Sequence, residues 1–129
     1  MTPTEREAFV TAPRIAILST LTPAGRVHSV PIWYRYADGA FRMITDPASV
    51  KVRNLHANPR ASLCVDERNP DAMAYVTVEG PVTFEKVTRE ERVAMWTRYR
   101  DAEVAAQVTA SNAHESMLLL VLRPERWMD

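Results

Sequence analysis

Short runs of β-forming residues, separated by turns that contain Pro or Gly, constrain the fold of this chain more than any other feature. Arg14 to Leu21 is apolar on both faces, as in a buried strand, and 26–36 is rich in Val, Ile, Trp and Tyr. Further strands are expected at 40–45, 60–66, 73–85 and 117–122. Helices are few and short, and no strand–helix–strand period repeats. The pattern predicts a mainly β fold, a six-stranded barrel or sandwich with a few short helices.

Three helical segments are expected around these strands. Thr2 or Thr4 is placed to cap a first helix that Pro13 ends. Thr88-Arg89-Glu90-Glu91 forms a capping box before a helix with Val93, Trp96 and Tyr99 on one stripe, and a shorter piece carries Val104 to Val108. The charges from 85 to 103 balance at five of each sign, which favours an ordinary solvated helical face.

Length and charge limit the function classes. The 129 residues form one domain, 1–129, with 16 basic and 16 acidic side chains and zero formal net charge. A generally basic surface for nucleic acid is therefore not expected. The longest wholly apolar run, Met117 to Leu122, is far shorter than the ~20 residues that cross a bilayer. With no export signal visible at the polar N-terminus, we expect a cytoplasmic protein without membrane contact.

The common catalytic motifs are missing from the sequence. His28, His56 and His114 share no spacing typical of metal ligands, so no metal site is expected. Cys64 lies in mid-strand, where an inert thiol is the usual occupant. With three glycines, the chain has no nucleophile elbow, phosphate-binding loop or dinucleotide fingerprint.

The stretch from Thr45 to Arg60 leaves a strand, starts a short helix and stops at Asn58-Pro59. Asp46-Pro47 or Ser49 can cap this helix, and Lys51 and Arg53 sit early in it. Cations at a helix start are unfavourable by ~0.3–1 kcal/mol each. Free backbone N–H groups with nearby cations and a hydroxyl form a seat for phosphate. The alternative is a solvated helix whose cations pair with acids, and the sequence leaves both open.

Pro31 interrupts an otherwise strong strand, Val30-Pro31-Ile32-Trp33. Proline cannot donate to a central ladder, so an edge position or a bulge is one explanation. The other is that the strand opens at this point and leaves backbone groups free to face a flat ligand.

Several segments together resemble one family, in their order and spacing. They are Ile17-Leu18-Ser19-Thr20 with Gly25, 29–34, Asp38-Gly39, 49–55, Asn58-Pro59-Arg60 and 75–80. They resemble the pyridoxamine 5′-phosphate oxidase-like split β-barrel family, whose barrel is of Greek-key type. The sequence is most similar to the small deazaflavin-dependent branch, which uses coenzyme F-420, while sister branches use FMN.

The resemblance implies a homodimer with each cofactor in a groove between subunits. It places the cofactor phosphate at Ser49, Lys51, Arg53 and Asn54. The tricyclic ring is expected along Val30, Pro31, Ile32 and Trp33, with Thr45 and Asp46 near the ring or its ribityl chain. The partner subunit is expected to close the groove with Tyr75 and the region near Trp127.

The expected function is that of an oxidoreductase that moves a hydride between F-420 or FMN and a small unsaturated substrate. No general acid is singled out; Tyr34, Tyr75 and His28 are candidates. The tail from Arg123 to Asp129 lacks the substrate-binding segment of the vitamin B6 oxidases, so their reaction is not expected. A non-catalytic dimeric barrel that binds flavin or haem is the main alternative, and an assembly module without cofactor is a third.

Overall fold

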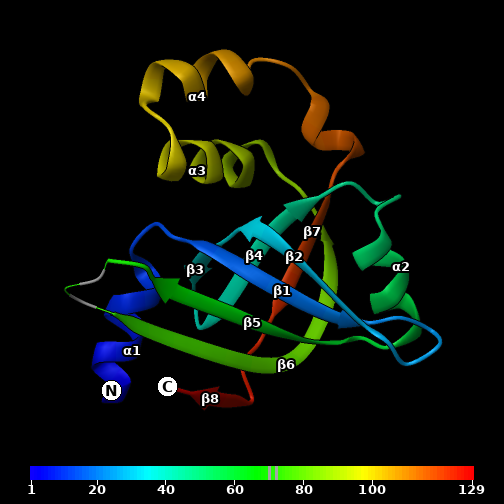
Figure 1. Cartoon of the computed structure of the whole chain (residues 1–129). Coiled ribbons are helices and arrows are strands. Elements are labelled where there is room, and N and C mark those ends of the chain that lie inside the picture. Colours follow the sequence, from blue (N-terminus) through cyan, green and yellow to red (C-terminus); the bar gives the residue numbers. More distant parts are fainter. Residues whose placement is uncertain (70, 72) are drawn as a thin grey trace.

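The computed structural model of the chain describes residues 1–69, 71 and 73–129, which form a curled antiparallel sheet with short helices around it (Figure 1). Within these residues the sheet has eight strands in the order β2-β1-β5-β6-β7-β4-β3, with β8 paired to β6. The strands are β1 (Ile15–Leu21), β2 (Val27–Trp33), β3 (Arg35–Ala37), β4 (Ala40–Thr45), β5 (Arg60–Glu67), β6 (Ala74–Lys86), β7 (Leu118–Leu122) and β8 (Arg126–Met128). The prediction of a mainly β fold is confirmed.

The helices lie at different ends of this half-open barrel. Figure 1 shows α3 and α4 stacked over one end, α2 beside the β1–β2 turn, and α1 near the β5–β6 hairpin. Their bounds are α1 (Pro3–Thr11), α2 (Val50–Ala57), α3 (Arg89–Tyr99) and α4 (Ala102–Val108), followed by the 3-10 helix η1 (Ala113–Ser116). In the described part of the chain, no helix is long and apolar enough to cross a bilayer.

The predicted long strand at 26–36 is divided at Tyr34 into β2 and β3. The backbone N–H of Tyr34 donates to the Tyr99 hydroxyl at 3.1 Å, and that hydroxyl lies 2.9 Å from the Tyr34 carbonyl. These bonds replace ladder pairing at one residue, so β2 pairs with β1 while β3 pairs with β4. The division and the short β8, which the sequence analysis missed, account for eight strands in place of six.

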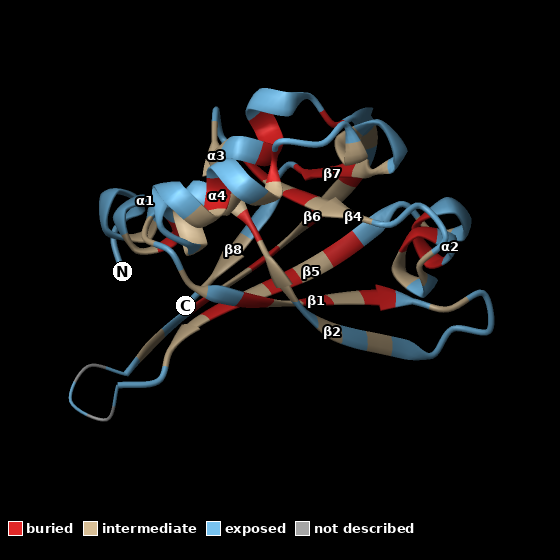
Figure 2. Cartoon of the chain, turned by 90° about the horizontal axis from the view of Figure 1, so that it is seen from above, coloured by how far each residue is buried: buried red, intermediate tan, exposed pale blue. Residues whose placement is uncertain are grey.

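One face of the curled sheet forms the core and the other is left outside (Figure 2). In β5 the predicted alternation is confirmed, since Ala61, Leu63 and Val65 are buried. In β1 the prediction of burial on both faces is wrong for the single chain: Ala16 and Leu18 are buried, but Ile15 is 47% exposed. A sheet that encloses its own core has only one inner face.

Apolar and small side chains from three adjacent strands cover the outside of this sheet. The register sets Ile17 opposite Pro31 and Cys64, and Leu21 opposite Val27. Directly opposed residues share a face of the sheet. We call this surface the outer sheet face; it comprises Ile15, Ile17, Leu21, Val27, Pro31 and Cys64.

Strand β6 changes partners at Gly80 and Pro81, where the sequence predicts a bulge or bend. It pairs with β5 as far as Pro81 and with β7 from Val82 onward. At this crossing the chain after β7 passes so close that a Cβ on Gly80 would lie 2.1 Å from the Arg123 carbonyl oxygen. The absence of a side chain is what permits this approach.

Gly80→Ala is therefore expected to lower the free energy of unfolding by ~1–3 kcal/mol, the range for forced overpacking. Elsewhere in a strand the same change removes chain entropy from the unfolded state and stabilises by roughly 0.5–1 kcal/mol. Urea unfolding of the variant and the parent protein measures the difference. A more stable variant would show that the backbone near Arg123 can move to admit the methyl group without loss of stability.

Helix α3 begins at Thr88 as predicted, but only half of the capping box forms. The Thr88 hydroxyl accepts the Glu91 backbone N–H at 3.1 Å. The Glu91 carboxylate does not return this bond, because it is occupied by Arg35 and Arg42. Glu91 and its neighbour Arg92 are 7% and 5% exposed, so the prediction that the charges of this stretch form an ordinary solvated face is wrong for these two residues.

Candidate functional site

The start of α2 carries backbone N–H groups that no side chain caps. Strand β4 ends at Thr45, and Asp46 then forms a tight turn in which its carboxylate accepts the Ala48 N–H at 2.8 Å. Ser49 is the N-cap residue, so the later of the two predicted starts is correct. Its hydroxyl makes no capping bond and lies 3.5 Å from the Thr45 hydroxyl. The first-turn N–H groups thus remain available to an anion.

Lys51 and Arg53 lie in the first turn of α2 without an acidic partner. Among the residues that the structure describes, no carboxylate oxygen lies within 4.0 Å of either side chain's nitrogens. Partial burial lowers the pKa of the Lys51 ammonium below its ordinary value of 10.5, and the Asp46 carboxylate opposes part of this shift. Arg53 is exposed. The alternative prediction, that Lys51 and Arg53 pair with nearby acids, is therefore not supported by any ion pair among the described residues.

Asn54 is not placed to contact a ligand. It has no exposed surface, and its amide donates to the Thr20 hydroxyl at 3.0 Å, which holds α2 against β1. The prediction that Asn54 contacts the phosphate is therefore corrected: its side chain positions α2 against β1. The error has a simple cause, because Asn54 lies between Val52 and Leu55 on the buried side of the helix.

The segment from Val30 to Trp33 presents alternate side chains to two environments. Val30 and Ile32 lie opposite Leu18 and Ala16 in the register, on the inner face, and their side chains are half-buried. Pro31 and Trp33 share the outer face.

Pro31 lies in β2, which is an edge strand of the described sheet. This agrees with the first of the two explanations for a proline in this strand, an edge position. The strand does not open there, because the pairing with β1 continues through Pro31 to Trp33.

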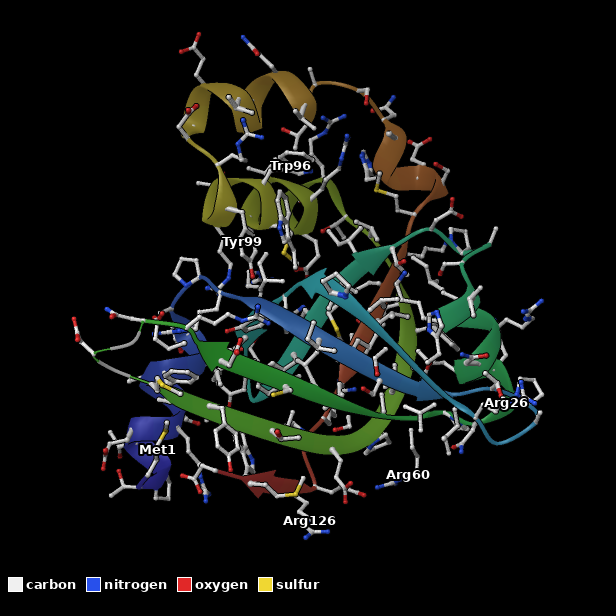
Figure 3. The ribbon with its side chains drawn as sticks, in the orientation of Figure 1. Met1, Arg26, Arg60, Trp96, Tyr99 and Arg126 are labelled. Carbon is white, nitrogen blue, oxygen red and sulfur yellow. The ribbon has the colours of Figure 1, made fainter. Side chains whose placement is uncertain are left out.

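A cavity of about 370 Å³ lies between the end of the barrel and α3. We call it the aromatic pocket; its lining residues are Trp33, Ile44, Thr45, Asp46, Arg92, Met95, Trp96, Ser116 and Met117. Trp33 meets Trp96 edge to face at 5.0 Å and stacks on Tyr99 at 4.6 Å. Trp96 and Tyr99 both come from α3 (Figure 3), so their contacts with Trp33 join this helix to the end of β2.

The aromatic pocket unites three predicted site residues, Trp33, Thr45 and Asp46, with side chains that the sequence analysis missed. Those from α3 are Arg92, Met95 and Trp96. The stripe expected on this helix was Val93, Trp96 and Tyr99, and Val93 proves to be exposed. The sequence signal that could have identified this face is a stripe shifted by one residue, through Arg92 and Met95. Its charged residue is of a type that is seldom buried.

The candidate proton donors lie away from the aromatic pocket or inside the core. Tyr34 is fully buried, its hydroxyl donates to the Val10 carbonyl at 2.8 Å, and burial raises its pKa to about 12. It is therefore unsuited to donate a proton to a ligand. His28 pairs with Thr20 near the β1–β2 turn.

Tyr75 is 54% exposed at the β5–β6 hairpin, at the opposite end of the barrel from α2 (Figure 1). Within one chain, Tyr75 and α2 do not form one site.

Nothing in the described residues suggests a metal centre, since no group of three or more His, Cys, Asp or Glu side chains is placed as metal ligands would be.

A family model described as pyridoxamine 5′-phosphate oxidase matches residues 2–129. The chain belongs to this family. No curated protein matches its sequence significantly.

Solved structures agree with a fold of the pyridoxamine 5′-phosphate oxidase family. A conserved hypothetical protein from Mycobacterium tuberculosis has a TM-score of 0.81 at 23% identity, over 98% of this chain and 82% of that one. An F420 reductase has a TM-score of 0.69 at 20% identity, over 95% and 94% of the two chains. A haem-binding protein from Mycobacterium smegmatis has a TM-score of 0.66 at 26% identity, over 99% of this chain and 55% of that one.

Proposed function

We propose that this protein is an oxidoreductase that transfers a hydride between a deazaflavin coenzyme, F-420 or alternatively FMN, and a small unsaturated organic substrate. The observation that carries the proposal is the start of α2, which has uncapped N–H groups and two cations without an acidic partner in the described part of the chain. It follows Thr45 and Asp46, which line the aromatic pocket. Such a start suits a phosphate, and the cavity lined by Trp33 and Trp96 gives a flat conjugated substrate a place beside the cofactor ring.

Each part of the site has a distinct role in this proposal. Ser49, Lys51 and Arg53 hold the cofactor phosphate, while Asn54 fixes α2 from within the core. Arginine offers paired N–H donors to phosphate and lysine a point charge. The ring lies along Pro31, Trp33 and the backbone edge of β2, with Thr45 and Asp46 near the ribityl chain. When bound, the cofactor supplies the two-electron chemistry, and the protein supplies orientation and shelter from water.

Coenzyme F-420 is the cofactor we favour. The fold likeness to an F420 reductase extends over nearly the whole of both chains and supports this choice. The sequence resemblance to the deazaflavin branch points the same way. FMN also carries a phosphate at the end of its ribityl chain, so the contacts at α2 do not by themselves separate the two cofactors.

The outer sheet face supports a homodimer as the working form. Val27 is 70% exposed and Ile15 is 47% exposed in the single chain, and both lie beside further apolar side chains. A second copy packed on this surface would remove it from water. Tyr75 of that copy would then close the groove over the cofactor, as the family resemblance implies.

Light scattering at micromolar concentration is expected to give the mass of a dimer. Val27→Glu places a charge on the outer sheet face without touching the core, and it should shift the protein toward the monomer. Val93→Glu makes the same change on α3, where Val93 is 39% exposed, and should leave the mass unchanged. A monomeric parent protein would contradict the shared groove.

A binding protein without turnover is the second candidate, and the fold likeness to a haem-binding protein favours it. The two functions separate in one assay. The protein is mixed under anaerobic conditions with reduced F-420 and a panel of enones and conjugated acids, and the return of the oxidised coenzyme is followed by absorbance. Faster oxidation with protein than without it supports the enzyme. Tight cofactor binding with no acceleration by any acceptor supports the binding protein.

A further inference from the structure

Arg92 is a buried cation at the lining of the aromatic pocket. It is 5% exposed, and its guanidinium donates to the Val108 carbonyl at 2.8 Å and to Ser111, carbonyl and hydroxyl, at 3.3 and 3.4 Å. Its Nε is buried and finds no hydrogen-bond partner in the described part of the chain. The Nε hydrogen and one Nη2 hydrogen of the guanidinium therefore have no acceptor among the described residues.

The positive charge of Arg92 also lacks a counter-charge. Within residues 1–69, 71 and 73–129, no carboxylate oxygen lies within 4.0 Å of its nitrogens. The adjacent Glu91 is already engaged by Arg35 and Arg42. An arginine does not lose its proton in a protein, so burial cannot neutralise it. The Val108 carbonyl at the end of α4 and the Ser111 oxygens carry only partial negative charge, so they offset the guanidinium in part. A buried charge without a full counter-charge is unfavourable, and an anionic ligand would relieve it.

The rest of the pocket suits an apolar, flat molecule. Five of its lining side chains are apolar or aromatic: Trp33, Ile44, Met95, Trp96 and Met117. Among the described residues that line it, Asp46 is the one acid; its carboxylate accepts the Ala48 N–H and lies near the Lys51 ammonium. Its charge is thus partly offset on its own side of the pocket.

We propose that the aromatic pocket binds the substrate and that Arg92 recognises a carboxylate on it, so that the substrate class is a small unsaturated carboxylic acid. This inference rests on the proposed function, since it assigns the substrate of that same site. A volume of about 370 Å³ holds one small conjugated acid. The planar guanidinium is the side chain best matched to a carboxylate.

Arg89 offers a matched control for a purely structural role. Like Arg92 it reaches from α3 to the segment after α4, donating to the Thr109 carbonyl at 2.7 Å and to the Asn112 amide oxygen at 2.5 Å. Unlike Arg92 it does not line the aromatic pocket. If Arg92 only ties α3 to that segment, the two arginines should respond alike to substitution.

The test compares cinnamate with cinnamamide, which differ in charge and hardly in shape, by calorimetric titration of the full-length protein. We expect the parent protein to prefer cinnamate by about tenfold or more, the value of one charge-assisted hydrogen bond. Arg92→Gln should lose this preference, Arg92→Lys should keep part of it, and Arg89→Gln should keep all of it. Equal or undetectable binding of both probes by the parent protein overturns the inference, as does equal loss in the Arg89 and Arg92 variants.

The same titrations, repeated with F-420 and with FMN, separate this inference from the proposed function. Cofactor binding without a preference for cinnamate refutes the inference alone. A preference for cinnamate without cofactor binding refutes the proposed function alone. If Arg92→Gln instead weakens binding of F-420, whose tail carries carboxylates, and the parent protein shows no preference for cinnamate, Arg92 serves the cofactor and the inference is wrong.

Discussion

Alanine at both Lys51 and Arg53 is expected to remove measurable cofactor binding at micromolar concentration while leaving the protein folded. A hydrogen bond to a charged group contributes ~1.5–3 kcal/mol, so each single variant should lose about tenfold to a hundredfold in affinity. Neither cation has an acidic partner in the described structure, so no intramolecular ion pair is broken. Fluorescence titration gives the affinities, and thermal unfolding checks the fold.

Arg60 is the matched control for these variants. It follows α2 directly and is exposed, but its guanidinium lies 2.5 Å from the Glu125 carboxylate. Because its charge is already neutralised, Arg60→Ala should bind cofactor like the parent protein. Unchanged affinity in both Lys51→Ala and Arg53→Ala would show that the phosphate is held elsewhere.

Glu91→Ala is expected to cause the largest loss of stability. The carboxylate lies 2.5 Å from Arg35 and 2.6 Å from Arg42, and its side chain is 8% exposed. Within the described part of the chain, removing it leaves the partly buried Arg35 without a carboxylate and Arg42 with only the Glu85 carboxylate, 3.9 Å away, and breaking a buried ion pair in this way costs ~3–5 kcal/mol. Because the network ties α3 to β3 and β4, the aromatic pocket should loosen together with the fold. The shift of the urea unfolding midpoint measures the effect.

Glu90 is the matched control for Glu91. It shows how much of the loss comes from removing any acid at the start of α3 and how much from breaking the ion pairs with Arg35 and Arg42. It occupies the same first turn of α3 but is exposed, so Glu90→Ala removes only the helix-dipole interaction, ~0.3–1 kcal/mol. Glu91→Gln retains an acceptor for one arginine and should fall between the two alanine variants. Equal stability of the two alanine variants would mean that the Glu91 network contributes little.

Patterns of apolar residues predicted most of the fold, because period-two alternation follows directly from which side of a strand is buried. The alternation in β5 is an example. The division at Tyr34 was out of reach, since it depends on the hydroxyl of Tyr99, sixty-five residues away in the chain. Strand β8 has only three residues after Pro124, too few for a pattern.

The candidate site could be predicted in part for a similar reason. Ser49, Lys51 and Arg53 are close in sequence, so one short helix brings them together. Arg92 and Met95 join the site only because α3 folds over the end of the barrel, a long-range packing event. Asn54 shows the opposite error, where a polar side chain among site residues is used to anchor the helix.

A fluorescence titration of the purified parent protein with F-420 and, separately, with FMN tests most directly whether this barrel holds a flavin-type cofactor at the start of α2. We expect saturable binding of at least one cofactor at micromolar concentration or below, with one site per chain. This binding should be lost in the double variant of Lys51 and Arg53 and kept in Arg60→Ala. No saturable binding of either cofactor by the folded protein would contradict the proposed cofactor site and favour a barrel that serves as an assembly module.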